Sequence, residues 1–231
     1  MSRTLKINEI FQSIQGESTW AGRVQTFVRL FGCNLKCSYC DTPYAQGDDK
    51  TEVKLIPLEE IVENVNSFGE PKSVCITGGE PLIQQPNVVQ LIDQLNARGY
   101  VISIETNGTI DIPDVLFEYP NVKIVMDVKC PSSGIDVGRK YPVVTARNLH
   151  RLRPRVDEIK FVVQENDDLF FMRNIIIGAP QGVTVLISPA NVSNLESIAK
   201  AIIETGWDWS RDVRMQLQLH KIIWPPEQRR V

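Results

Sequence analysis

Apolar runs of strand length recur along the chain, and stretches with helical spacing lie between most of them. Several runs are almost continuous in valine and isoleucine, which is typical of parallel strands that are buried on both faces. Such an alternation favours right-handed parallel βαβ units, arranged as an open sheet or as a barrel. We expect strands over residues 24–31, 73–77, 100–105, 122–128, 158–163, 183–187 and 213–219.

Helices are expected in four of the intervening stretches. Ser193 and Glu196 have capping-box spacing and open one of these helices, which Gly206 ends. Apolar spacing or a following glycine indicates the other three. These cover residues 57–68, 86–98 and 167–177.

Polar or glycine-rich corners follow four of the expected strands, at residues 77–81, 105–108, 127–132 and 188–191. In a (β/α) barrel, the carboxyl ends of the strands share one rim, and active sites are built on that rim. The expected strands are too few for a closed barrel of eight. We therefore predict an α/β fold in the form of a partial (β/α) barrel, with about six parallel strands and one open side.

Composition narrows the class of protein. The 231 residues carry 25 Lys+Arg and 28 Asp+Glu, a net charge of −3, and we expect a single domain over residues 1–231. The near-neutral charge and the absence of a long basic run argue against a nucleic-acid partner. We find no apolar run long enough for a membrane span or a signal peptide, so we expect a cytoplasmic protein without a membrane partner.

Three of the five cysteines fall within eight residues, where Cys33, Cys37 and Cys40 have the spacing C-x3-C-x2-C. Cysteine thiolates are the ligands of iron–sulfur clusters, and three of them on one loop can hold such a centre. Three ligands on a four-iron cluster leave one iron open to a small molecule, which suits catalysis. The other two, Cys75 and Cys130, receive no ligand role.

The cysteine loop has two other interpretations besides an iron–sulfur cluster. A structural zinc site takes four protein ligands, and no fourth cysteine or histidine lies nearby. A redox pair of Cys37 and Cys40 leaves Cys33 unexplained. A non-catalytic zinc or electron-carrier module therefore remains the alternative from a different class of protein.

The cysteine triplet, followed by Gly78-Gly79-Glu80-Pro81, resembles the radical S-adenosylmethionine superfamily. The resemblance implies a four-iron, four-sulfur cluster whose open iron is chelated by S-adenosylmethionine, and whose reduction releases a 5′-deoxyadenosyl radical. Small activases that install a glycyl radical on a partner enzyme share these features, and they are the alternative within the superfamily.

The whole chain is similar to the 7-carboxy-7-deazaguanine synthase family. The similarity is carried by Arg29 and by residues 13–17, 40–43, 77–81, 105–108, 127–129 and 218–221. It implies a lyase of queuosine precursor biosynthesis that contracts the ring of 6-carboxy-5,6,7,8-tetrahydropterin, giving 7-carboxy-7-deazaguanine and ammonia, with S-adenosylmethionine as a catalytic cofactor. It also implies Mg²⁺, a homodimer and a reductant such as flavodoxin.

The same similarity assigns roles to individual residues and implies no protein acid or base. The cluster ligands are Cys33, Cys37 and Cys40, and the magnesium ligand is Thr42. The substrate contacts are Ile14, Gln15, Gly16, Glu17, Arg29, Thr77 and His220. The S-adenosylmethionine contacts are Gly79, Glu80, Glu105, Asn107, Lys129, Ser132, Ser188, Pro189, Ala190 and Asn191.

The chain then divides into a substrate-binding segment over residues 1–22, a core over 23–220 and a tail over 221–231. Two features depart from the family pattern. Ser18 stands where many relatives carry glycine, and the tail extends beyond the terminal carboxylate that shorter relatives place in the substrate site. No contact of that carboxylate is transferred to this chain.

Overall fold

Nine strands form one sheet in the computed structural model, which describes residues 3–47, 53–191, 193, 195–204, 210–225 and 228–230. The strands are β1 Thr4–Ile14, β2 Val24–Leu30, β3 Lys54–Pro57, β4 Ser73–Gly78, β5 Val101–Thr106, β6 Val122–Asp127, β7 Glu158–Val163, β8 Thr184–Pro189 and β9 Val213–Met215. Their spatial order is β3-β1-β2-β4-β5-β6-β7-β8-β9. All seven expected strands are present, and they pair in parallel.

The described part of the sheet is open, because β3 and β9 stand at its two ends and do not pair with each other. The predicted partial barrel is confirmed. The sequence did not indicate β1 and β3, which pair antiparallel at one end. The last expected strand is shorter than predicted and ends at Met215. Beyond it, the amides of Gln216 and Gln218 bind Ser18 and Glu17.

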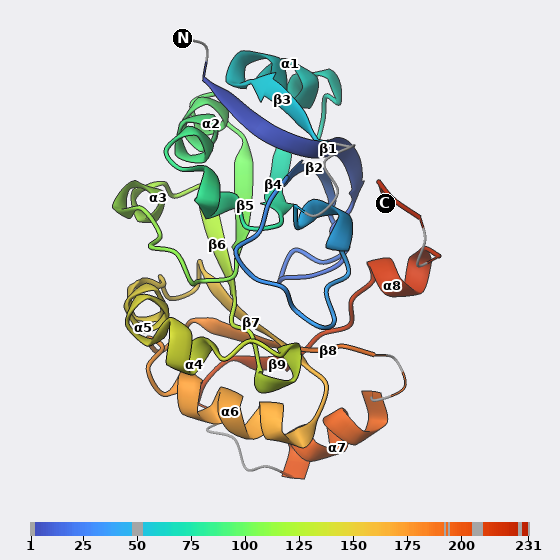
Figure 1. Ribbon diagram of the computed structural model, residues 1–231, viewed down its shortest axis with the longest axis vertical. Coiled ribbons are helices and arrows are strands. Elements are labelled where there is room, and N and C mark those ends of the chain that lie inside the picture. The colour runs from blue at the N-terminus through green and yellow to red at the C-terminus, as the bar shows by residue number, and fades with distance from the viewer. Residues whose placement is uncertain are drawn as a thin grey trace.

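All the longer helices cover one side of this sheet. The helices are α1 Leu58–Ser67, α2 Asn87–Asn96, α3 Asp114–Glu118, α4 Val137–Lys140, α5 Pro142–Arg151, α6 Asn166–Ile176, α7 Leu195–Glu204 and α8 His220–Ile223, with 3-10 turns η1 Pro43–Ala45, η2 Pro81–Gln84 and η3 Pro131–Ser133. Figure 1 shows α2, α3, α5, α6 and α7 following one another around the sheet, with α8 on the other side. The four expected helices are confirmed as α1, α2, α6 and α7, while Gly206 lies outside the described residues.

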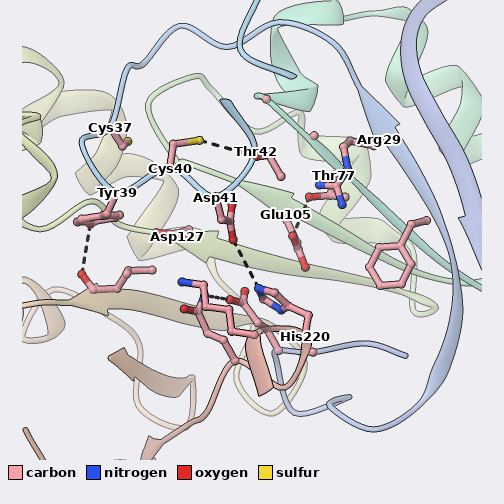
Figure 2. Close-up of a pocket in the computed structure, with 18 of the residues that line it drawn as sticks. Arg29, Cys37, Tyr39, Cys40, Asp41, Thr42, Thr77, Glu105, Asp127 and His220 are labelled. Atoms are coloured by element: carbon pink, nitrogen blue, oxygen red, sulfur yellow. Dashed lines mark hydrogen bonds and ion pairs between the residues drawn. The ribbon is translucent and has the colours of Figure 1, made fainter. Parts of the chain in front are cut away.

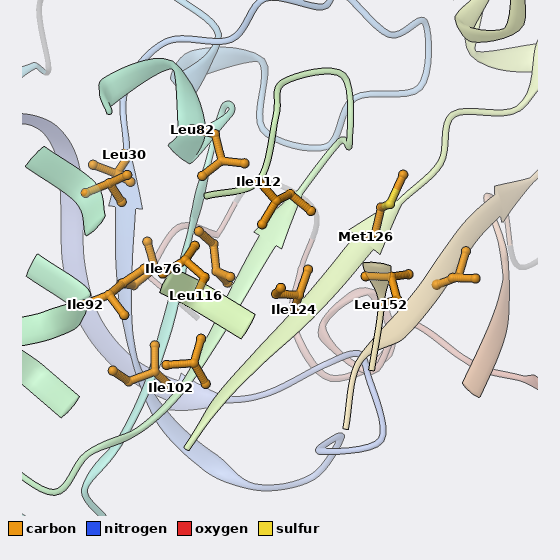
Figure 3. Close-up of a cluster of buried hydrophobic side chains, with 14 of the residues drawn as sticks. Leu30, Ile76, Leu82, Ile92, Ile102, Ile112, Leu116, Ile124, Met126 and Leu152 are labelled. Atoms are coloured by element: carbon orange, nitrogen blue, oxygen red, sulfur yellow. The ribbon is translucent and has the colours of Figure 1, made fainter. Parts of the chain in front are cut away.

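Alternate side chains of the parallel strands point to opposite faces of the sheet. Val28, Ile76, Ile104 and Phe161 point to the helices and belong to one buried apolar cluster. Figure 3 shows this cluster between strands and helices, where each fully buried side chain contributes about 1.5–3 kcal/mol. The neighbours of these residues in sequence face the inside of the curved sheet. Many of them are polar, so the inner face can build a site.

A β-bulge in β1 shifts by one residue the alternation of its side chains between the two faces of the sheet. Ile7 pairs with Leu30 and Glu9 pairs with Arg29, so the register shifts by one residue at Asn8. Ile7 and Leu30 belong to the helix-facing cluster, whereas Glu9 and Arg29 bind each other on the inner face. In a regular strand, residues two apart point to the same side. The bulge therefore turns Glu9 inward.

Among the described residues, no helix combines the length and the apolar character that crossing a bilayer requires.

Candidate active site

A cavity of about 540 Å³ lies on the inner face, where the parallel strands reach their carboxyl ends. Its walls come from the β1–β2 loop (residues 15–23), the cysteine loop (residues 31–42), the strand ends and the chain after β9, and Figure 2 shows part of them. Seventeen candidate residues predicted from the sequence line it: Ile14, Gln15, Gly16, Glu17, Arg29, Cys33, Cys37, Cys40, Thr42, Thr77, Gly79, Glu105, Asn107, Lys129, Ala190, Asn191 and His220.

The cysteine loop presents all three half-buried thiols to this cavity. It is fixed at both ends, since Cys33 N donates to Gln46 O at 3.0 Å and the Tyr39 hydroxyl donates to Val162 O at 3.2 Å. Burial raises the pKa of Cys37 to about 11. A free Cys37 thiol is thus protonated at neutral pH, and iron must displace the proton when it binds.

The donor set fits an iron–sulfur cluster. Three cysteine sulfurs are ligands of the kind that such clusters require. Within the described ranges, no three His, Cys, Asp or Glu side chains converge closely enough to hold a single metal ion. A four-iron cluster takes each thiolate on a different iron, so its ligands need no common point.

The Gly78-Gly79 corner packs directly against the cysteine loop. Glu80 N donates to Gly32 O at 2.8 Å, and a Cβ atom on Gly79 would lie only 2.0 Å from the same oxygen. Only glycine permits this approach of two backbones. The corner therefore fixes the start of the cysteine loop, in addition to lining the cavity.

Four candidates for S-adenosylmethionine contacts do not line the main cavity: Glu80, Ser132, Ser188 and Pro189. The buried Glu80 carboxylate accepts from Leu82 N, Asn107 N and the Thr106 hydroxyl, and burial raises the pKa of Glu80 to about 6. Ser132 binds Asp168 on α6. Ser188 Oγ is buried and has no partner among the described residues, and Pro189 lines a separate small cavity.

Arg29 lines the cavity with a mostly buried side chain. Its Nε donates to Glu9 Oε1 at 2.7 Å, and its guanidinium lies 5.6 Å from the centroid of the Phe11 ring. Burial lowers the pKa of Arg29, but Tyr44 and Glu9 raise it more, so the pKa lies above its usual value. The remaining donors on this planar cation suit a carboxylate ligand.

Glu105 lies with the substrate candidates. It accepts from the Thr77 hydroxyl at 2.8 Å and from the Gln15 amide at 3.5 Å. The same Gln15 amide also donates to Gln25 at 2.9 Å. The sequence placed Glu105 among the S-adenosylmethionine contacts, whereas its neighbours in the structure are Thr77 and Gln15.

A buried charge network supports the floor of the cavity. Lys160 Nζ donates to Glu17 and lies 3.0 Å from Asp127 Oδ2, and Lys129 Nζ also lies 3.0 Å from that oxygen. Burial lowers the pKa of Lys160, but the two carboxylates raise it well above its usual value. Burial raises the pKa of Glu17, yet Lys160 and His220 bring it below its usual value.

The β1–β2 loop crosses the inner face and is held along its length. Ser18 O accepts from the Gln216 amide at 2.6 Å, and Lys123 Nζ donates to Thr19 Oγ1 at 2.6 Å while pairing with Glu158. Ser18 has φ +65°, in the left-handed region that favours glycine. Glycine would adopt this backbone conformation without strain.

His220 connects the start of α8 to two other walls. Its Nε2 lies 3.5 Å from Asp41 Oδ2 in the cysteine loop. A Cβ atom on Gly16 would lie 2.5 Å from His220 Nδ1, so this glycine makes room for the ring. Burial raises the pKa of Asp41, but hydrogen bonding and charge from His220 lower it below its usual value.

Sequence reasoning assigned no role to several lining residues. Asp127 lay in a quoted motif, and Lys160 carried a readable signal, since a lysine in the middle of an apolar strand needs a buried partner. Asp41, Gln218 and Lys221 lay within the segments 40–43 and 218–221 that carry the family similarity, but they received no role. Others gave no local signal, because distant segments bring them to the site; they include Tyr39, Tyr44, Trp224, Arg229 and Arg230.

Comparison with known proteins shows which family this chain resembles. The family described as "Radical SAM superfamily" matches residues 28–154. A 7-carboxy-7-deazaguanine synthase from Methanospirillum hungatei is 40% identical over 97% of this chain and 88% of that protein. One from Thermoplasma acidophilum is 37% identical over 94% of this chain and 96% of its own. The crystal structure of QueE from Escherichia coli shares the fold, with a TM-score of 0.72, 24% identity and coverage of 93% and 94% of the two chains.

Proposed function

Since the chain belongs to the radical S-adenosylmethionine superfamily and, within it, to the 7-carboxy-7-deazaguanine synthase family, we propose that it converts 6-carboxy-5,6,7,8-tetrahydropterin to 7-carboxy-7-deazaguanine and ammonia. The observation that carries the proposal is the single cavity that the three cysteines, Arg29 and Glu105 line together. In this role the enzyme is a carbon–nitrogen lyase of queuosine precursor biosynthesis.

Cys33, Cys37 and Cys40 would hold the four-iron cluster. When bound and reduced, the cluster and S-adenosylmethionine supply the carbon radical that removes a hydrogen atom from the substrate. We assign S-adenosylmethionine contacts to the lining residues Gly79, Asn107, Lys129, Ala190 and Asn191. Four further candidates lie outside the cavity lining and would support these contact residues from behind: Glu80, Ser132, Ser188 and Pro189.

The residues opposite would bind and orient the pterin. Arg29 offers its free donors to the carboxylate, and Thr42 offers a hydroxyl to Mg²⁺. Gln15 and Glu105 supply an amide and a carboxylate for the polar edge of the ring, and Thr77 orients Glu105. Ile14, Gly16, Glu17 and His220 complete this part of the wall.

Further parts of the proposal follow from the family alone. They are a substrate-binding segment over residues 1–22 ahead of a core and a tail within one domain, a homodimer, a cytoplasmic location, and a flavodoxin-type reductant. Size-exclusion chromatography with light scattering tests the dimer.

The decisive experiment uses anaerobically reconstituted enzyme with reductant, S-adenosylmethionine, Mg²⁺ and 6-carboxytetrahydropterin, and identifies the product by mass spectrometry. We expect 7-carboxy-7-deazaguanine. Cleavage of S-adenosylmethionine without this product would overturn the proposal and favour an activase. Cys37→Ala should lose the brown cluster and turnover, whereas Cys130→Ala, which alters a buried cysteine that does not line the cavity, should keep about four irons.

A further inference from the structure

A chain of buried side-chain hydrogen bonds runs behind the cavity wall, from Gln15 through Gln25 to Ser73. Gln15 Nε2 donates to Gln25 Oε1 at 2.9 Å, and Gln25 Nε2 donates to Ser73 Oγ at 2.8 Å. Gln25 lies on β2, is fully buried and does not line the cavity, whereas Gln15 does. Any effect of Gln25 on a ligand must therefore pass through Gln15.

One backbone N–H group sets the direction of this chain. Glu17 N lies 3.0 Å from the side-chain amide of Gln15 and can only donate, so the Gln15 atom that faces it is Oε1. Gln15 Nε2 then points the other way, and Gln25 must present its oxygen to it. The backbone of Gln15 is fixed separately, because its N–H donates to Arg23 O at 2.7 Å. Gln25 thus acts on the side chain of Gln15 and leaves its backbone to the loop.

Gln15 Nε2 carries two hydrogen atoms, and Gln25 accepts only one of them. Glu105 Oε1 lies 3.5 Å from the same nitrogen, at the long limit of a hydrogen bond. Gln15 and Glu105 both line the cavity. The second N–H of Gln15 is therefore weakly held and can turn to a ligand beside Glu105.

Two side chains of β4 hold Glu105 in place. The Thr77 hydroxyl donates to Glu105 Oε2 at 2.8 Å, and the Cys75 thiol donates to Glu105 Oε1 at 3.5 Å. Figure 2 shows Glu105 beside Thr77. Burial and the charge of Glu105 raise the pKa of Cys75 well above its usual value, so the thiol keeps its proton and remains a donor. The wall thus presents a fixed carboxylate next to a fixed amide donor.

We propose that Gln25 is a positioning residue that sets the ring specificity of the site, because it holds the Gln15 amide as a donor beside Glu105; this inference rests on the proposed function. The edge of a pterin carries two neighbouring donors, the 2-amino group and N3–H, followed by the 4-oxo acceptor. Glu105 suits the two donors, and the second N–H of Gln15 suits the 4-oxo group. A 4-amino group would instead face that N–H, and neither donor would have an acceptor.

The test compares binding of 6-carboxytetrahydropterin with binding of its 2,4-diamino analogue, in which an amino group replaces the 4-oxo group. Anaerobic holoenzyme with S-adenosylmethionine and Mg²⁺, but without reductant, is titrated in a calorimeter so that no turnover occurs. Gln25→Met keeps the length of the side chain and removes its polar end. We expect this variant to bind the pterin about fivefold more weakly and the diamino analogue almost unchanged.

A double-mutant cycle tests whether Gln25 acts through Gln15. Gln15→Met/Gln25→Met should bind the pterin no more weakly than Gln15→Met alone, because the second change has no amide left to orient. Ser73→Ala removes the far end of the chain and should reduce the preference for the pterin by less than Gln25→Met does. Gln90→Met is the matched control, since Gln90 lies on α2 outside the cavity lining and its loss should leave both affinities unchanged.

Equal weakening for the two rings, no weakening for the pterin, or additive effects in the cycle would overturn the inference. If thermal unfolding shows that Gln25→Met does not fold, Ser73→Ala decides, and an unchanged ring preference in that variant overturns the inference. Reduction then tests turnover separately. A preference for the pterin that depends on Gln25, without deazaguanine formation, would overturn only the proposed function.

Discussion

Lys160 Nζ lies 3.0 Å from Asp127 Oδ2 and donates at the same time to Glu17, so one buried ammonium joins two parallel strands to the β1–β2 loop. All three side chains lie on the inner face and line the cavity. A buried ion network costs desolvation free energy and gives little net stability over apolar packing. The network instead fixes the position of the β1–β2 loop, which carries Gln15 and Gly16.

Lys160→Met should destabilise the protein by about 3 kcal/mol, because it leaves two buried carboxylates with less compensation. In wild type, folding lowers the pKa of Glu17 and Asp127, so their contribution is present at neutral pH and is lost as pH falls below about 4. Without Lys160, burial raises the pKa of Glu17. The difference in stability between the variant and wild type should therefore become smaller as the pH falls.

Thermal unfolding midpoints between about pH 7 and about pH 4 check this prediction. Lys200→Met is the matched control, since Lys200 pairs with Glu196 on the exposed face of α7 and its loss should leave the pH profile unchanged. A gap for Lys160→Met that stays constant with pH would contradict the role given to the network.

Gly79→Ala should unfold the cysteine loop locally, because its Cβ would meet Gly32 O. We expect a loss of about 3 kcal/mol and little bound iron after reconstitution. Gly99→Ala is the control: φ is +79° there and nothing lies near the added Cβ, so the cost is about 1 kcal/mol and iron binding persists. Normal iron content in Gly79→Ala would show that the corner does not fix the loop.

Thr42→Ala should keep the cluster and require more magnesium. Thr42 Oγ1 lies 3.8 Å from Cys40 Sγ without supporting the loop backbone through its side chain. Loss of one hydroxyl ligand should raise the half-saturating Mg²⁺ concentration about fivefold, equivalent to about 1 kcal/mol. Thr42→Ser should behave like wild type, and an unaltered magnesium titration of Thr42→Ala would remove Thr42 from the metal site.

Thr19→Val should loosen the β1–β2 loop, since Lys123 and Glu158 lose the hydroxyl between them. We expect about 1–3 kcal/mol of destabilisation and a higher KM for the pterin, with little change in kcat. Steady-state kinetics and thermal unfolding measure both effects. Thr4→Val, at the far end of β1, controls for the substitution, and an unchanged KM in Thr19→Val would mean that the loop stays in place without this anchor.

The sequence predicted the parallel part of the fold because apolar runs and helical spacing are local signals. It missed β1 and β3, which have mixed polarity and, in β1, a bulge that interrupts the alternation. The polar and glycine-rich corners after the strands indicated most of the residues that line the cavity. The pairing of Lys160 with Glu17 was not predictable, because 143 residues separate the two partners.

The bulge at Asn8 keeps the apolar side chains on both sides of it directed toward the helices. Leu5 and Ile7 belong to the helix-facing core and Ile10 packs against it, while Glu9 stays on the inner face with Arg29. If β1 paired regularly through Asn8, Asn8 would stand opposite Arg29, and Glu9 would stand opposite Val28 on the helix-facing side. The one extra residue in the bulge thus decides whether Arg29 has a counterion on the inner face.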